Sequence, residues 1–203
     1  MKFQDQTFQD RHKESESQSF HIMNKLYEKK HIKAFKKTSV EIDKSGTDYL
    51  VDFGDGNFKT VQFKLRKEKY QDIPICRFQP FRGIEWHTVG RDYKSLIQQK
   101  NEYYFVSTQD NNLQYKSITF TNTSRLVELM IEAEQEWFPR EDAWTYFNQH
   151  LYNNYLNKGK FTVRLKTAKN GVQAWFRKNK YENFGKINYY IPIKYSDKTI
   201  KLD

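Results

Sequence analysis

A predicted β-hairpin constrains the fold of this 203-residue chain more than any other feature. Apolar and polar residues alternate in SVEIDKSGTDYLVDF (39–53) and in FKTVQFKLRK (58–67), and the turn-like sequence FGDGN (53–57) joins the two stretches. A period of two is typical of half-buried strands, and an Asp-Gly pair between them is typical of a tight turn. The sequence therefore predicts two antiparallel strands on either side of this turn.

The length of the turn decides which side chains share a face of the hairpin. With a three-residue loop over 54–56, whose last glycine is in the left-handed conformation, Asp48 lies opposite Gln62. Asp48, Gln62 and Lys64 then share one face, because side chains alternate along each strand. A two-residue loop would shift the register by one and send Asp48 to the other face.

These three side chains carry groups suited to metal-dependent phosphodiester hydrolysis. Asp48 and Gln62 offer oxygen ligands to a hard cation such as Mg²⁺. Lys64 can orient a water molecule or neutralise the charge that develops on a phosphate. The alternative, judged from spacing alone, is a hairpin whose polar face simply points to water.

The rest of the chain alternates predicted helices and strands. Phe20, Met23 and Tyr27 at helical spacing predict a helix over 14–30. The pattern further predicts a strand at about 38–43, an irregular stretch over 70–90, and a short helix over 91–102 that leads into the strand YYFVS (103–107). A mostly helical stretch follows over 124–157, capped by Thr123 or Ser124 and interrupted by Pro139. The last predicted strands lie at about 161–166, 172–177 and 187–194.

This order predicts an α/β (mixed α+β) fold with a central mixed sheet flanked by helices. We expect a core over 1–110 and a basic, aromatic-rich helical and β section over 111–203. The second section is either an extension or part of the same domain.

The order and spacing of the residues resemble the PD-(D/E)XK nuclease superfamily, which includes many restriction endonucleases and Holliday-junction resolvases. Thr47-Asp48 stands at the "PD" step and Gln62-Phe63-Lys64 at the "(D/E)XK" step. The resemblance covers about residues 14–107, where it implies the helix, three strands, helix and strand of a restriction-endonuclease-like core.

The resemblance implies a Mg²⁺- or Mn²⁺-dependent endonuclease that acts on DNA. Asp48, the Gln62 side chain and the Phe63 carbonyl are then the metal ligands, and Asp48, Gln62 and Lys64 are catalytic. A helix glutamate assists the metal site in this family, and Glu16 is the candidate because it lies toward the inner face of the helix. Glu14 is the alternative.

One position departs from the family pattern. Gln62 stands where the family usually has Asp or Glu, which removes one negative charge and weakens cation affinity. Asp52, on the same strand face as Asp48, can compensate if the strand end curves inward; the alternative is an exposed hairpin acid. Gln99 and Tyr103 match the QxxxY pattern of RecB-like nucleases, although Tyr103 can equally be a packing residue.

The positive charge is concentrated at the C-terminal end. The chain carries 35 Lys and Arg against 25 Asp and Glu, for a net charge of +10, and residues 158–203 carry most of the excess. Aromatic residues interleave with cations there, in VRLK, QAWFRKNK and NYYIPIKY, a pattern typical of nucleic-acid binding. Solvated lysines are the plainer alternative. The residues expected to contact nucleic acid are Arg66, Lys67, Lys69, Arg82, Arg91, Gln99, Tyr103, Arg177, Lys178 and Lys180.

Composition excludes several classes of protein. The mean hydropathy is −0.97, the sequence has no apolar run long enough for a membrane span, and the first residues do not resemble a secretory signal, so no membrane partner is expected. A single cysteine, Cys76, excludes a disulfide scaffold and suits the cytoplasm.

Two other functions stay open: nucleic-acid binding on a nuclease scaffold that no longer cleaves, and binding of an acidic protein. A homodimer is an open alternative to a monomer.

Overall fold

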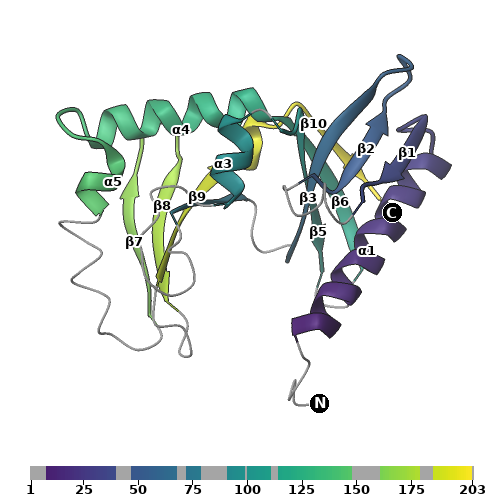
Figure 1. Cartoon of the computed structure of the whole chain (residues 1–203), viewed down its shortest axis with the longest axis horizontal. Helices are drawn as coiled ribbons and strands as arrows, with labels where there is room; N and C mark the ends of the chain where they lie inside the picture. Colours follow the sequence, from purple (N-terminus) through teal and green to yellow (C-terminus); the bar gives the residue numbers. More distant parts are fainter. Residues whose placement is uncertain are drawn as a thin grey trace. The chain divides into compact units, whose positions relative to one another are not determined.

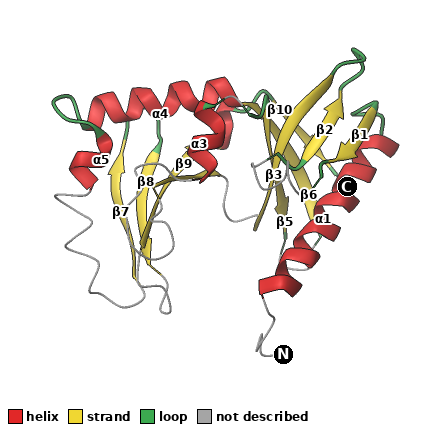
Figure 2. Cartoon of the chain, in the orientation of Figure 1, coloured by secondary structure: helices red, strands yellow, loops and turns green. Residues whose placement is uncertain are grey.

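The computed structural model describes residues 8–39, 47–67, 72–78, 91–98, 100–110, 114–147, 161–178 and 185–202. The fold is mixed α/β with a mixed sheet, as expected (Figures 1 and 2). Two compact units interleave along the chain. The first unit comprises residues 1–70, 101–120 and 197–203, and the second comprises residues 71–100 and 121–196.

The first unit contains a six-stranded sheet in the order β1-β2-β3-β5-β6-β10. β1, β2 and β3 pair antiparallel, β3 and β5 pair parallel, and β10 pairs antiparallel with β6. Helix α1, Phe8–Glu28, contacts β1 and β3. The strands are β1 Ala34–Lys37, β2 Tyr49–Asp52, β3 Phe58–Lys67, β5 Tyr103–Gln109, β6 Tyr115–Asn122 and β10 Lys198–Lys201.

The core of the first unit lies between α1 and one face of this sheet. Ile22, Met23 and Leu26 of α1 are fully buried in one cluster with alternate residues of the strands, among them Tyr49 and Phe63. The Tyr49 and Phe63 rings meet edge to face at 6.1 Å. Alternation along β2 and β3 therefore directs Gln62 and its even-numbered neighbours to the opposite face of the sheet.

The hairpin register is the one that the three-residue loop predicts. Tyr49 pairs with Val61 and Asp52 pairs with Phe58, which is the register of a three-residue loop. The regular ladder ends at Tyr49, because the Asp48 N–H donates to the carbonyl of Val61, the residue that already pairs with Tyr49. The last loop residue, Gly56, has a positive φ of 78°. The three-residue loop is therefore confirmed.

The second unit contains a four-stranded antiparallel sheet in the order β4-β9-β8-β7. Helix α4, Thr123–Trp137, packs on one face, where the Trp137 ring meets the Tyr189 ring edge to face at 5.5 Å. Buried Phe176, Ile187 and Ile191 lie on this covered face. The other elements are β4 Asp72–Phe78, α3 Arg91–Ile97, α5 Ala143–Tyr146, β7 Phe161–Thr167, β8 Gln173–Lys178, β9 Gly185–Pro192 and the short 3₁₀ helix η2 Ile193–Tyr195.

Several predicted elements are confirmed, and others need correction. β5, α4 and the last three strands of the second sheet lie where the sequence predicts them, within a few residues. α1 and α3 also overlap their predicted ranges, but α1 begins at Phe8 rather than at residue 14, and α3 ends at Ile97 rather than at residue 102. The cap of α4 is Asn122, whose side chain accepts a hydrogen bond from the Ser124 N–H, rather than Thr123 or Ser124. The first strand lies at Ala34–Lys37, and residues 40–43 of the range predicted for it lie outside the described residues. Residues 148–157 of the predicted helical stretch also lie outside them.

Strand β4 occupies part of the stretch that reads as irregular. Pro74 lies within it, and proline is tolerated because β4 is at the edge of its sheet, where one side of the strand needs no backbone partner. The expected division at residue 110 separates strands that pair in one sheet, since β6 and β10 lie beyond it. Among the described helices, none is both long and apolar enough to cross a membrane.

Candidate active site

Asp48 lies directly against the backbone of the strand that carries the (D/E)XK-like residues. Its Oδ2 accepts a hydrogen bond of 2.6 Å from the Phe63 N–H, and its own N–H donates to the Val61 carbonyl at 2.9 Å. One N–H bond uses one of about four acceptor positions of a carboxylate. The hairpin thus brings Asp48 and the Gln62-Phe63 step together at the start of β2.

A threonine holds the start of β2 in place. The Thr38 hydroxyl donates to the Thr47 carbonyl at 2.6 Å, and the Thr38 N–H donates to the Asp48 carbonyl at 3.2 Å. These bonds fix the backbone of the "PD"-like step to the end of β1. Sequence reasoning missed Thr38, because its role depends on the alignment of β1 with β2.

Gln62 and Lys64 lie on the sheet face opposite α1. Gln62 is 1% exposed, whereas Lys64 is half-buried. Their partners on parallel β5 are Tyr104 and Val106, both fully buried. Gln62 is therefore shielded from water and Lys64 partly so, and charge–charge and charge–dipole interactions are stronger there than in water.

The candidate metal ligands are oxygen atoms, which suits a hard divalent cation, but together they carry little negative charge. The Asp48 carboxylate, the Gln62 amide oxygen and the Phe63 carbonyl oxygen are ligands of the kind that Mg²⁺ accepts. Together they contribute one formal negative charge. The part of the chain that the structure describes contains no group of three or more His, Cys, Asp or Glu side chains able to hold a metal ion.

The two candidate helix glutamates point to different strands. Glu16 forms an ion pair of 3.1 Å with Lys37, the β1 residue that pairs with Tyr49. Burial raises the pKa of Tyr115 in β6 to about 12, and the charge of Glu14 adds to this. Glu16 therefore lies at the β1–β2 end of the sheet on the face that α1 covers, and Glu14 lies toward β6. Gln62 and Lys64 are on the other face, so the structure does not bring Glu16 beside them.

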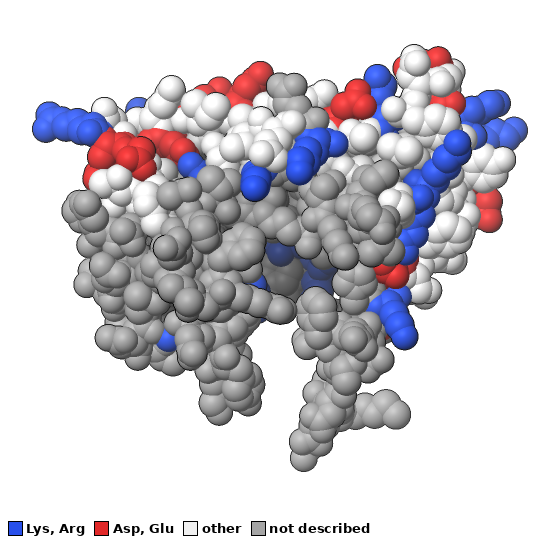
Figure 3. All heavy atoms as spheres, in the orientation of Figure 1, with Lys and Arg blue, Asp and Glu red and all other residues white. Residues whose placement is uncertain are grey.

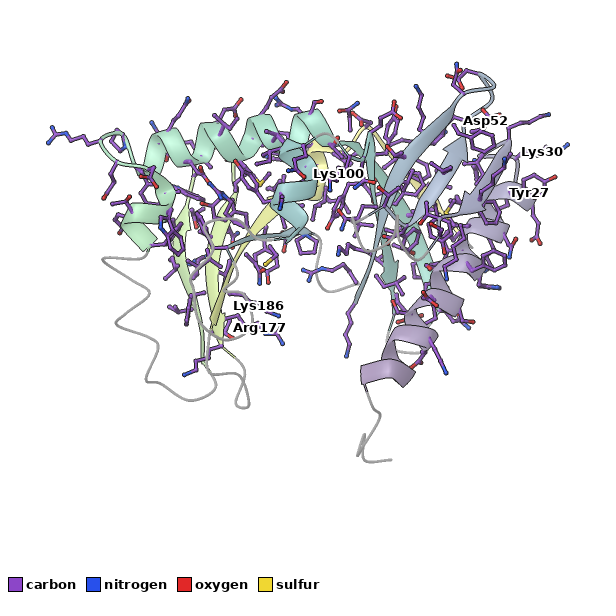
Figure 4. The ribbon with its side chains drawn as sticks, in the orientation of Figure 1. Tyr27, Lys30, Asp52, Lys100, Arg177 and Lys186 are labelled. Atoms are coloured by element: carbon purple, nitrogen blue, oxygen red, sulfur yellow. The ribbon has the colours of Figure 1, made fainter. Side chains whose placement is uncertain are left out.

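Asp52 has a structural role in the hairpin turn. Its Oδ1 accepts hydrogen bonds from the N–H groups of Gly54 at 2.7 Å and Gly56 at 3.1 Å. Figure 4 labels it beside the loop between β2 and β3. Asp52 is 8% exposed, so it is a buried acceptor of the turn rather than the exposed acid of the alternative.

Only some of the residues expected to contact nucleic acid have described side chains. Lys67 and Arg177 are exposed and Arg66 is half-buried. Tyr103 packs against the core with its ring 5.2 Å from that of Phe53, which confirms the packing alternative. Lys178 is 8% exposed on the covered face of β8, which argues against a direct phosphate contact. Lys69, Arg82, Gln99 and Lys180 lie outside the described residues, as does the side chain of Arg91.

Charges of both signs are spread over the surface. In the view of Figure 3, the Lys and Arg atoms lie interspersed with Asp and Glu atoms rather than in one continuous basic area. No family model, curated protein or solved structure matches the chain.

Proposed function

We propose that this protein is a metal-dependent nuclease that hydrolyses phosphodiester bonds of DNA, with a PD-(D/E)XK-like site. The observation that carries the proposal is the 2.6 Å bond between Asp48 Oδ2 and the Phe63 N–H. It brings the acid of the first motif step to the backbone of the second.

The order of elements supports the same proposal. α1, β1, β2, β3, α3 and β5 follow one another as the helix, three strands, helix and strand of the resembled core, with β3 and β5 parallel. One departure is the insertion of β4, which joins the other sheet. A second is that α3 clusters with the second unit.

In the proposed mechanism, Asp48, the Gln62 side chain and the Phe63 carbonyl would hold the cation. When bound, Mg²⁺ or Mn²⁺ supplies Lewis-acid polarisation of the phosphate and a more acidic water. Asp48 is oriented by its bond to the Phe63 N–H and by the Thr38 bonds to its backbone. Lys64 orients the attacking water or neutralises the developing negative charge. Glu16 lies beside Lys37 on the opposite face of the sheet and takes no part in this mechanism.

The test is cleavage of plasmid and labelled linear DNA in Mg²⁺ and in Mn²⁺. We expect Lys64→Ala to lower the rate about 10²- to 10³-fold, the range typical of losing one group that stabilises transition-state charge. Asp48→Asn keeps an oxygen for the Phe63 N–H but loses the charge, and it should abolish metal-dependent cleavage. Lys59→Ala is the matched control, because Lys59 is on the same strand and pairs with Glu102 at 3.2 Å. Parental cleavage by Lys64→Ala would refute the proposal.

A second function, nucleic-acid binding without cleavage, is favoured by the state of Gln62. A neutral side chain, 1% exposed, stands where the resembled family usually has an acid. This function predicts salt-dependent binding with no cleavage in either metal. Cleavage that appears only in Gln62→Glu would support it and would count against the first function.

A further inference from the structure

The sheet of the second unit has one face that α4 does not cover. Along β8, Ala174 and Phe176 are buried against the helix side, whereas Trp175 and Arg177 alternate with them and are half or fully exposed. The same alternation continues in β9, where Lys186, Asn188 and Tyr190 are half-exposed. We call the face formed by Arg164, Gln173, Trp175, Arg177, Lys186, Asn188 and Tyr190 the open face.

Strand pairing arranges the open face as aromatic residues next to cations. Trp175 pairs with Arg164 of β7 on one side and with Asn188 of β9 on the other. The Arg164 guanidinium lies over the Trp175 ring at 5.9 Å, and the Tyr190 ring lies 6.3 Å from it. Directly opposed residues on one sheet face have Cβ atoms about 5 Å apart, so these groups form one continuous surface.

The cations gather at one end of this face. Arg177 pairs with Lys186 directly across β8 and β9, and Figure 4 shows the two side by side. The described residues of the four strands include a single acid, Asp72, which pairs with Pro192 at the opposite end of the sheet. The open face is therefore complementary to a chain of negative charges.

Trp175 is held in position while half-exposed. Its indole N–H donates to the Gln173 Oε1 at 2.9 Å, which satisfies the polar edge of the ring. A ring fixed before binding loses little conformational entropy when a planar group stacks on it. Its face is nearly perpendicular to that of Tyr190, at 82°, so each ring presents its own surface.

We infer that the open face binds single-stranded nucleic acid, with bases stacked on Trp175 and Tyr190 and the backbone phosphates along Arg164, Arg177 and Lys186. Stacking on aromatic rings beside a positively charged track is how proteins bind single strands without reading sequence. A duplex hides the faces of its bases, so the rings favour an unpaired strand. The inference deepens the proposed function and depends on it for its biological role, because it names the form of nucleic acid delivered to the protein.

The test measures binding of the full chain in EDTA, where cleavage does not interfere. The probes are labelled oligothymidine and oligouridine of about 16 nucleotides, and a duplex of the same length. We expect the parent to bind both single strands more tightly than the duplex. Trp175→Ala should weaken single-strand binding about 5- to 150-fold, the range for one stacked base, and Trp175→Phe should keep most of the affinity.

The salt dependence tests the cations separately. Arg177→Ala with Lys186→Ala should reduce the slope of log affinity against log salt concentration by about 1.4, which is about 0.7 for each single-strand phosphate that is no longer neutralised. Lys169→Ala is the matched control, since Lys169 is exposed at the β7–β8 turn away from the open face, and it should leave the slope unchanged.

Three results would overturn the inference: parental affinity in a folded Trp175→Ala protein, equal affinity for the duplex, or equally effective competition by polyglutamate. A preference between oligothymidine and oligouridine decides whether the strand is DNA or RNA. Asp48→Asn distinguishes the two proposals, because it should retain single-strand binding while losing cleavage. If the parent never cleaves but Trp175→Ala still weakens binding, the nuclease proposal is wrong and the inference that the open face binds single strands is supported.

Discussion

Breaking the buried ion pair between Arg77 and Glu134 should destabilise the second unit strongly. Arg77 Nε donates to Glu134 Oε1 at 2.6 Å and its Nη2 donates to Oε2 at 3.3 Å. The two side chains are only 10% and 18% exposed. The guanidinium also lies over the rings of Tyr93 at 3.8 Å and Phe78 at 4.1 Å. The perturbation is Glu134→Gln, which removes the carboxylate and leaves the arginine in place.

The expected loss of stability in Glu134→Gln follows from leaving the Arg77 charge buried without its carboxylate partner. Burial opposes its charged form, but the hydrogen bond and charge of Glu134 outweigh this and raise the pKa of Arg77. Without Glu134 the guanidinium stays charged, because its pKa is too high for it to neutralise. Removing one partner of a buried pair costs about 3–5 kcal/mol. With about 2–4 °C per kcal/mol for a chain of this size, the melting temperature should fall by about 6–20 °C.

The assay is thermal and urea unfolding followed by circular dichroism. Arg77→Met with Glu134→Leu removes both charges and should lie close to the parent, since replacing a buried pair by apolar side chains is often neutral or stabilising. The exposed pair of Arg125 and Glu128, at 3.0 Å, supplies the control: Arg125→Met should cost less than about 1 kcal/mol. The reasoning is refuted if Glu134→Gln unfolds with the parent, or if the double variant is less stable than either single one.

Three further predictions concern packing, the hairpin turn and alkaline pH. Gly185→Ala should destabilise the protein by about 1–3 kcal/mol, because the added Cβ would collide with the ring of Phe176. Combining it with Phe176→Leu should recover part of the loss in urea unfolding. Asp52→Ala removes the acceptor of two turn N–H groups and should cost about 1–3 kcal/mol, while Asp52→Asn should cost less. Tyr115 has a folded-state pKa raised to about 12 against an ordinary 10.0, so its contribution to stability is complete below pH 10 and is lost as the pH rises through 12. Tyr115→Phe has no group to ionise, so its stability should fall less than that of the parent between pH 10 and 12. If urea unfolding gives the variant and the parent the same dependence of stability on pH, the raised pKa of Tyr115 is contradicted.

The hairpin and its faces were predictable because they depend on neighbouring residues. The three-residue loop sets the register, which pairs Tyr49 with Val61 and leaves Asp48 at the end of the ladder. Local patterns likewise predict α1, α4 and the strands from β7 to β9. The motif residues Asp48 and Gln62 are brought near each other by this local register.

Other features were hidden because they depend on partners distant in sequence. β4 reads as irregular since Pro74 interrupts its pattern, and only the edge position of the strand makes the proline acceptable. Arg77 and Glu134 are 57 residues apart, and neither carries a local signal of its partner. Glu16 and Glu14 are two residues apart on one helix, and the packing of α1 decides that Glu16 meets β1 and Glu14 lies toward β6.

The sequence by itself determined that a hairpin forms, that residues alternate between its two faces, and that cations and aromatic residues are mixed in the C-terminal strands. It left two loop lengths open, and the structure has the three-residue loop. The tertiary structure decided which strands share a sheet, that the Asp48 carboxylate meets the Phe63 N–H, and that Trp175 and Tyr190 lie on one open face with Arg164, Arg177 and Lys186. The physical reason is the range of the interactions. Side-chain periodicity and turn geometry act between neighbours, whereas strand partners are chosen by apolar burial across segments far apart in the chain.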